Sequence, residues 1–257
     1  MFVLSFPRAC RTHTTLPANE RVLEETIRQI AIWALPVLIA IVFHEVAHGW
    51  VANRLGDPTA ARMGRLTLNP LAHIDLYGTI LIPLFLIIAH APFLFGYAKP
   101  VPVNFSNLRN PKRDMIWVAL AGPATNLLLA LASALLLRVT LPALAAAARG
   151  SPSMFDEFLA PIALMARNGV LINVVLAVFN AFPIPPLDGG RVAVGLLPEP
   201  YSAKFARVER FGFLIVLILL MTHMLDRVIG PPIDFLINLY FGLLSPTGTP
   251  WTQLLAA

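Results

Sequence analysis

Two histidines and a glutamate lie inside an apolar stretch of the chain, where residues 43–50 read FHEVAHGW. His44 and His48 are four residues apart, so in a helix their imidazoles lie on one face, about one turn apart. Glu45 is rotated about a third of a turn from them, where it can reach a water on a metal without binding the metal. Neutral imidazole is a good zinc ligand, and this spacing is typical of zinc-dependent peptide hydrolysis.

The alternative is that the pattern has arisen by chance, as a short motif with two free positions does in many soluble chains. The apolar surroundings argue against this alternative. A charged side chain at the centre of a bilayer costs about 2.5–3.5 kcal/mol on insertion scales. Three ionisable side chains in one apolar helix therefore favour a function over an accident.

A third ligand must come from elsewhere, because a catalytic zinc takes three protein ligands and keeps its fourth position for water. The best candidate is Asp188, which follows a proline-rich turn in FNAFPIPPLDGGRV, residues 179–192. Gly189 and Gly190 allow the backbone to bend sharply or to approach a neighbour closely. The alternative is an ordinary turn in which Asp188 caps the N-terminus of a helix.

The composition is that of a polytopic membrane protein, since 57% of the 257 residues are hydrophobic and 13% are charged. Soluble domains have about 25% charged residues. Apolar stretches at 26–54, 114–140, 161–182 and 207–243 approach or exceed the roughly 20 residues that cross a bilayer as a helix. The last stretch is expected to break at Gly230–Pro232 into a helix and a shorter segment.

The remaining composition excludes several classes of protein. The net charge of +5 comes from Lys and Arg residues scattered between apolar segments, so we expect no binding of nucleic acid. The single cysteine, Cys10, excludes an internal disulfide and a cysteine-rich metal cluster. We divide the chain into an N-terminal tail (1–25), a membrane-embedded domain (26–243) and a C-terminal tail (244–257).

A shared metal site restricts the topology. The two histidines lie near the C-terminal end of helix 26–54, and Asp188 follows the C-terminal end of helix 161–182. These helices must run parallel, so the segment 79–95, which is short and broken by prolines, does not cross the membrane. The prediction is an all-α transmembrane bundle with about five to six membrane segments, one of them re-entrant or interfacial.

Three motifs in this order, HEVAHGW, AGPATN and NAFPIPPLDGGRV, resemble the site-2 protease family of intramembrane zinc metalloproteases. GYAKPVPVN and NPLAHID are similar to a compact bacterial branch of that family, and the resemblance covers residues 35–195. No segment resembles the PDZ or CBS domains of some relatives. The resemblance implies cleavage of other membrane proteins within or near their transmembrane segments, in a multi-pass protein of the cell membrane, expected to be the bacterial inner membrane.

The resemblance also implies roles at the site. One Zn²⁺ per chain would be held by His44, His48 and Asp188, and Glu45 would act as the general base. Asn180 is the candidate for stabilising the oxyanion or holding the substrate backbone; the alternative is a hydrogen bond between helices.

Three further polar residues receive simpler interpretations. Asn126 is expected mainly to join helices, with a place beside the site as the alternative. His73 and His90 are expected in loops or at the interface, not among the ligands.

A protein that carries or stores metal is the competing function, and Glu45 distinguishes the two, because a carrier needs no base beside its ligands. An inactive relative is disfavoured, since every residue of the minimal site is present. The expected partners are a transmembrane substrate and the lipid bilayer. The sequence gives no indication of the oligomeric state.

Overall fold

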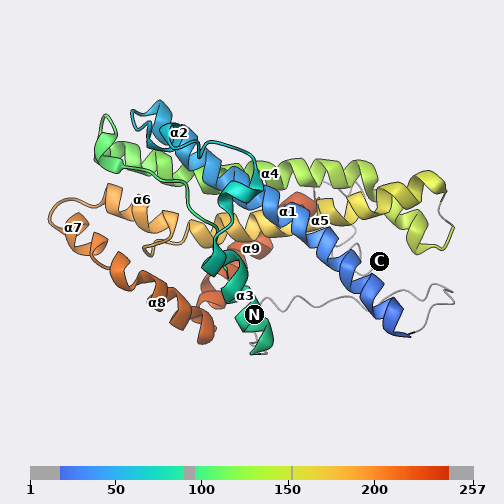
Figure 1. The fold of residues 1–257 in the computed structure, drawn as a ribbon. Coiled ribbons are helices and arrows are strands. Elements are labelled where there is room, and N and C mark those ends of the chain that lie inside the picture. Colours follow the sequence, from blue (N-terminus) through green and yellow to red (C-terminus); the bar gives the residue numbers. More distant parts are fainter. Residues whose placement is uncertain (1–17, 90–95, 152, 243–257) are drawn as a thin grey trace.

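The computed structural model describes residues 18–89, 96–151 and 153–242, and every regular element in them is helical, without a β-strand. Three long helices, α1 (Ala18–Arg54), α4 (Pro111–Ala148) and α5 (Met154–Asn180), lie side by side (Figure 1). Each is long and apolar enough to cross a membrane. α1 and α5 run in the same direction and α4 runs against them, so the predicted parallel arrangement is present.

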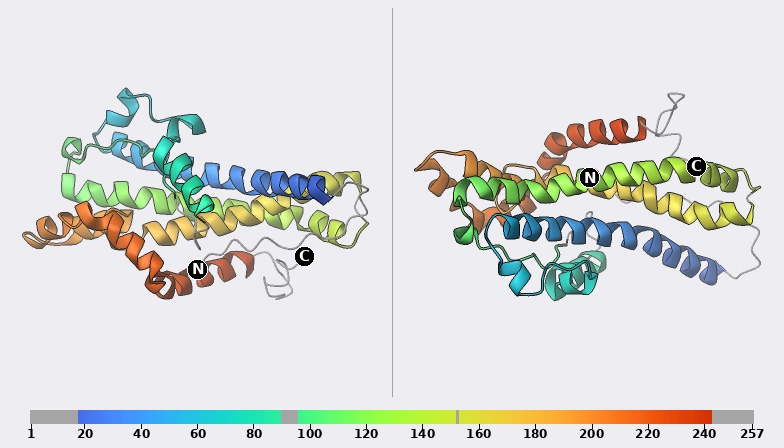
Figure 2. Two further views of the ribbon diagram at one scale, coloured as in Figure 1. Left: turned by 60° about the horizontal axis from the view of Figure 1, so that its bottom comes forward. Right: turned by 90° about the horizontal axis from the view of Figure 1, so that it is seen from above.

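Small side chains allow α4 and α5 to pack closely. The largest buried cluster joins α4, α5 and α9 (Met224–Gly242), and alanines supply much of the first two faces, with Ala130, Ala134, Ala163 and Ala166 all at most 3% exposed. Small residues let backbones approach in a lipid environment, where dispersion contacts stabilise helix association. Figure 2 shows α9 on one side of this pair, with α1 on the other.

The described part of the apolar segment between α1 and α4 forms only short helices. It consists of η2 (Leu76–Leu81), a π-helical turn of 6 residues, and α3 (Ile82–Ile88), a helix of 7 residues. Together they span about 20 Å, against about 30 Å of hydrocarbon. Their length agrees with the predicted re-entrant or interfacial segment, while residues 90–95 lie outside the described part of the chain. The total of five to six membrane segments stays a prediction.

The predicted break in the last apolar stretch is at the wrong position. α8 (Glu209–Met221) and α9 meet at 81°, and the turn between them places His223 at φ +55°. Pro231 and Pro232 lie inside α9. Leu225 and Ile233 belong to a face with four-residue spacing that is buried in the core, so packing outweighs the roughly 3 kcal/mol that a proline costs inside a helix.

The connection between the apolar stretches predicted at 114–140 and 161–182 is shorter than the sequence indicates. α4 continues to Ala148 through LPALAAAA, where alanine, the best helix former, predominates. α5 begins at Met154 because Ser153 and Asp156 form a capping box, in which each side chain accepts a hydrogen bond from the backbone N–H of the other residue. α1 likewise begins at Ala18, eight positions before the predicted start.

Asp57 fixes the connection between α1 and α4. Its carboxylate is 0% exposed and accepts hydrogen bonds from the Thr59 hydroxyl, from the Asn104 backbone N–H at 2.7 Å and from Asn107 Nδ2 at 2.9 Å. Burial opposes ionisation of Asp57, but these hydrogen bonds outweigh it and hold the pKa of the carboxyl below its usual range. The end of α1 is thereby joined to the extended segment 96–104.

We expect Asp57→Asn to destabilise the fold by about 1–3 kcal/mol, because an amide cannot accept from all these donors and leaves one buried and unpaired. The lowered pKa means that the ionised carboxylate stabilises the fold above the unfolded pKa of about 3.9, and that this stability is lost as the pH falls through the folded pKa. Thermal unfolding in detergent should therefore show a lower Tm for the variant at pH 7 and a smaller difference at pH 3. The exposed Asp234→Asn is the matched control, and an equal effect of both variants would contradict the role of Asp57.

Candidate metal centre

The structure brings together the three residues that the sequence predicts as ligands. His44 and His48 come from α1, and Asp188 is the first residue of α6 (Asp188–Leu196). Asp188 Oδ2 lies 3.2 Å from His44 Nε2 and 3.3 Å from His48 Nε2, and the two Nε2 atoms are 3.0 Å apart. All three side chains are buried.

This arrangement fits a zinc ion. With bonds of about 2.0–2.2 Å, a tetrahedral ion separates its ligand atoms by about 3.3–3.6 Å, close to the spacing of the three donor atoms. Within the described residues, Asp188 Oδ2 is buried without a hydrogen-bond partner and faces both imidazoles. A buried carboxylate oxygen without a donor is costly unless a cation pairs with it.

The other ring nitrogen of each histidine is already used. His44 Nδ1 lies 2.5 Å from Asn126 Oδ1, and His48 Nδ1 lies 2.6 Å from the carbonyl oxygen of Val118. Both partners are acceptors, so each Nδ1 carries the proton and donates it, which leaves the Nε2 lone pair directed at the site. The hydrogen bonds thus select the tautomer that binds a metal.

Asn126 orients His44 and also joins three helices. Its side chain is 0% exposed, and Nδ2 donates to Asn173 Oδ1 at 2.8 Å and to the Ala40 carbonyl at 3.3 Å. Asn173 Nδ2 in turn donates to the Gly169 carbonyl at 2.8 Å. Both sequence interpretations of Asn126 therefore hold. The sequence analysis did not single out Asn173. Its polar amide within the apolar run VLINVVLAV could have indicated a buried hydrogen bond.

Gly122 of α4 lies directly against the two histidines. A β-carbon placed there would be 2.4 Å from His48 Nε2 and 2.6 Å from His44 Nε2. These are the atoms that face Asp188, so any side chain at this position would enter the centre. The AGP of the AGPATN motif is thus the place where α4 makes room for the imidazoles.

Glu45 is bonded to the extended segment 96–104, which runs beside α1. Its Oε2 accepts a hydrogen bond of 2.8 Å from the backbone N–H of Val101. Pro100 and Pro102 lack this donor, so Val101 supplies the only N–H of the Pro-Val-Pro sequence. The carboxylate is therefore held at a defined place next to His44, and Val101 is a partner that the sequence did not reveal.

Asp188 is positioned by a close contact between the turn and α6. A β-carbon at Gly189 would lie 2.1 Å from the Ala181 carbonyl oxygen, so only glycine fits there. Leu187 occupies the N-cap position and Asp188 follows it in the helix. The alternative of Asp188 as a helix cap is therefore not what the structure shows.

Two of the other predicted polar residues, Asn180 and His73, form hydrogen bonds to backbone carbonyls. Asn180, the last residue of α5, donates through Nδ2 to the Leu176 carbonyl of its own helix at 3.0 Å, so its catalytic role stays a prediction. His73 is buried in η1 (Pro70–His73), with Nε2 2.9 Å from the Thr67 carbonyl. His90 lies outside the described residues.

Comparisons with known proteins agree with this site. The profile of Peptidase family M50 matches residues 32–168 and 144–223. The chain is 34% identical over 220 residues to "Putative zinc metalloprotease YwhC" of Bacillus subtilis, covering 82% of this chain and 92% of that protein. It is 32% identical over 195 residues to "Putative zinc metalloprotease Rip2" of Mycolicibacterium smegmatis, covering 74% and 66%.

Rip2 of Mycobacterium tuberculosis strain H37Rv is 29% identical over 190 residues, with 74% and 66% covered. No solved structure matches the chain. The residues matched by the family profile include His44, His48 and Asp188. The chain belongs to peptidase family M50, the site-2 protease family, and is a membrane-embedded zinc metalloendopeptidase.

Proposed function

We propose that the protein is an intramembrane endopeptidase that hydrolyses peptide bonds within or near the transmembrane segments of other membrane proteins. The observation that carries this proposal is the burial of the His44–His48–Asp188 group among membrane-capable helices. His48 lies six residues, about 9 Å, before the end of α1, so the group is set back from the end of the helix. A substrate bond must reach that depth to be cut.

The chain supplies the elements of a metal-dependent hydrolysis. His44, His48 and Asp188 would hold one zinc ion, which would supply Lewis acidity and lower the pKa of water toward about 7. Glu45 takes the proton of the attacking water and passes it to the leaving amine nitrogen. Asn126 and the Val118 carbonyl hold the imidazoles in the metal-binding tautomer throughout.

Asn180 is proposed as the donor that stabilises the developing oxyanion or holds the substrate backbone. It ends α5, eight residues before Asp188, and an amide nitrogen offers two N–H groups, of which Leu176 takes one. The alternative from the sequence is a hydrogen bond between helices; the bond to the Leu176 carbonyl lies within α5.

We place the protein in the cell membrane as a multi-pass protein, in the inner membrane of a bacterium. The three apolar helices and the bacterial source of the relatives named above support this placement. Its partners are the lipid bilayer and substrates that themselves span the membrane.

Removal of zinc is the experiment that tests the proposal. We expect a chelator to lower the cleavage of a single-span substrate in reconstituted vesicles by at least about 100-fold, since a catalytic metal supplies several kcal/mol of transition-state stabilisation. Zinc added at one ion per chain should restore the rate, whereas Mg²⁺ should not. Undiminished cleavage by protein measured to be free of zinc would contradict the mechanism.

A further inference from the structure

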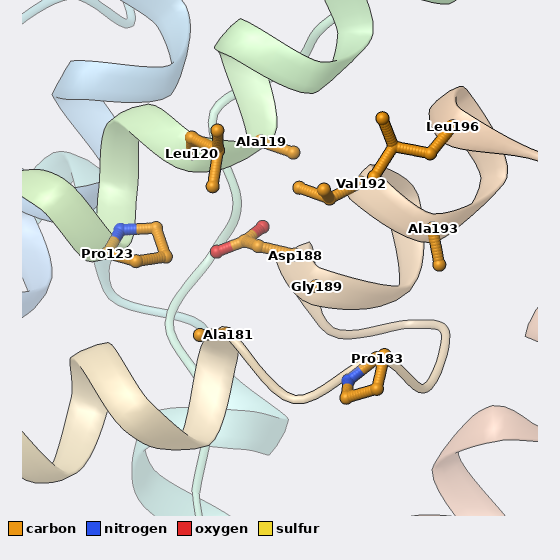
Figure 3. Close-up of a pocket in the computed structure, with 10 residues that line it drawn as sticks. All are labelled: Ala119, Leu120, Pro123, Ala181, Pro183, Asp188, Gly189, Val192, Ala193 and Leu196. Carbon is orange, nitrogen blue, oxygen red and sulfur yellow. The ribbon is translucent and has the colours of Figure 1, made fainter. Parts of the chain in front are cut away.

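A cavity of about 230 Å³ lies beside the metal centre, between α4 and α6 (Figure 3). Ala119 and Pro123 form the side contributed by α4, while Val192 and Ala193 form part of the side contributed by α6. Asp188 is the one ionisable residue among those that line it, and Figure 3 shows its carboxylate directed toward the α4 wall. The cavity is therefore apolar apart from a proposed metal ligand.

The cavity has a buried end and an exposed end. Asp188 is 7% exposed, whereas Leu120 and Leu196, which also line the cavity, are 39% and 70% exposed. An apolar group can thus enter past the two leucines and reach a residue of the metal centre. The cavity therefore extends from the surroundings of the protein to Asp188.

We propose that this cavity receives the apolar side chain of the substrate residue next to the scissile bond; the inference rests on the proposed function. Neighbouring Cα atoms are 3.8 Å apart, so a peptide with its carbonyl at the metal centre has a flanking side chain within reach of Asp188. The position of the cavity beside a metal ligand favours a substrate side chain over a lipid chain as its occupant.

The volume indicates which side chains fit. Apolar cavities of about 150 Å³ bind benzene, so 230 Å³ is sufficient for the ring of phenylalanine or for a leucine side chain. Glycine or alanine at the same substrate position would leave most of the cavity unfilled. The substrate class is therefore a transmembrane segment with a large apolar residue beside the cut bond.

The width of the cavity is set by close packing. A β-carbon at Gly195 would lie 2.5 Å from Ile116 Cγ1, so α6 cannot come nearer to α4 or move away without losing this contact. Gly189 fixes the start of α6 against Ala181 in the same way. Because α6 is held against its neighbours at both of its ends, its distance from α4 is fixed. The space between the two helices then depends on the size of the side chains at Ala119 and Ala193.

Ala193→Leu tests the proposal by filling the cavity from α6. The substrates are single-span polypeptides with a mapped cut site that carry Ala, Leu or Phe at one flanking position. Wild-type protein is expected to prefer Leu and Phe over Ala in kcat/KM by at least about 10-fold, the lower end of what one methylene contributes in an apolar pocket. The variant should reduce or reverse this preference.

Ala203→Leu is the matched control, because Ala203 is an exposed alanine on α7 (Tyr201–Ala206) that does not line the cavity. It should keep the wild-type preference. If wild-type protein cleaves but shows no preference at either flanking position, the inference is wrong and the proposed function stands. A uniform change across all substrates in Ala193→Leu, as expected for a lipid occupant, would also overturn it. If the zinc-bound protein cleaves none of the substrates, both the inference about the cavity and the proposed function are wrong.

Cysteine crosslinking gives a readout that does not depend on turnover. In a Cys10→Ser, Glu45→Gln background, the only cysteine of the chain is removed and cleavage is suppressed. Ala193→Cys should then form a disulfide with a substrate cysteine at the flanking position and much less with one four residues away. Equal crosslinking at both positions would contradict the proposed placement.

Discussion

Gly122→Ala is expected to lower the zinc affinity by more than about 100-fold, and peptide hydrolysis should fall with it. The added methyl group would lie 2.4–2.6 Å from atoms of both imidazoles. The rings cannot turn away, because each Nδ1 is held by an acceptor, Asn126 Oδ1 for His44 and the Val118 carbonyl for His48. Losses around metal ligands are typically 10–100-fold, and this change acts on two donors at once.

The affinity is measured as zinc per chain after equilibration with a buffered series of free zinc concentrations. Gly230→Ala is the matched control, since a β-carbon at that helical position meets nothing within 4 Å. A Gly122→Ala protein that retains zinc as well as Gly230→Ala would show that the two histidines are not the ligands. Retention of the fold is checked by the helical circular dichroism of both variants.

Glu45→Gln is expected to reduce kcat by about 10²–10⁴-fold, the range supplied by general acid–base catalysis, while zinc stays bound. Glutamine has the shape of glutamate, and its amide oxygen can still accept the hydrogen bond from Val101. What it loses is the ability to take a proton from water. The change therefore separates the chemistry of the base from the position of the segment 96–104.

Single-turnover cleavage and zinc content are measured on the same preparation of the Glu45→Gln variant. Glu24→Gln is the control, because Glu24 is an exposed glutamate on the same helix, far from the metal centre. Cleavage at the wild-type rate would refute the role of Glu45. Wild-type cleavage by the variant with zinc bound would indicate that another residue is the base. Loss of zinc from the variant would instead indicate that Glu45 contributes to metal binding.

Local sequence rules were sufficient to predict that His44, His48 and Asp188 lie together and to predict the helices that bring them there, while their role as ligands stays a prediction. The four-residue spacing of His44 and His48 places both imidazoles on one face of a helix. The need for a third ligand then led to Asp188, which the structure places beside them. The parallel course of α1 and α5 followed from that pairing alone. These features depend on short-range geometry or on one long-range contact, which is why they were predictable.

The contacts that hold the ligands were not predictable from local rules. Asn173, the Val118 carbonyl and the Val101 N–H belong to segments far from α1 in sequence, and backbone atoms carry no residue type to recognise. The cavity beside Asp188 likewise depends on how closely α6 approaches α4. The break between α8 and α9 was misplaced because tertiary packing outweighed the proline signal.

The distance along the chain between the donors also determines when, during synthesis, all three donors are present. His48 and Asp188 are 140 positions apart, so at about 5–20 residues per second a ribosome needs roughly 7–28 s to add the last donor. Both histidines of α1 are made before that interval, and α4, with Gly122 and Asn126, is made during it. If Asp188 is a ligand as proposed, a chain that stops before it lacks one of the three donors, and we expect no peptide hydrolysis until that residue has been made.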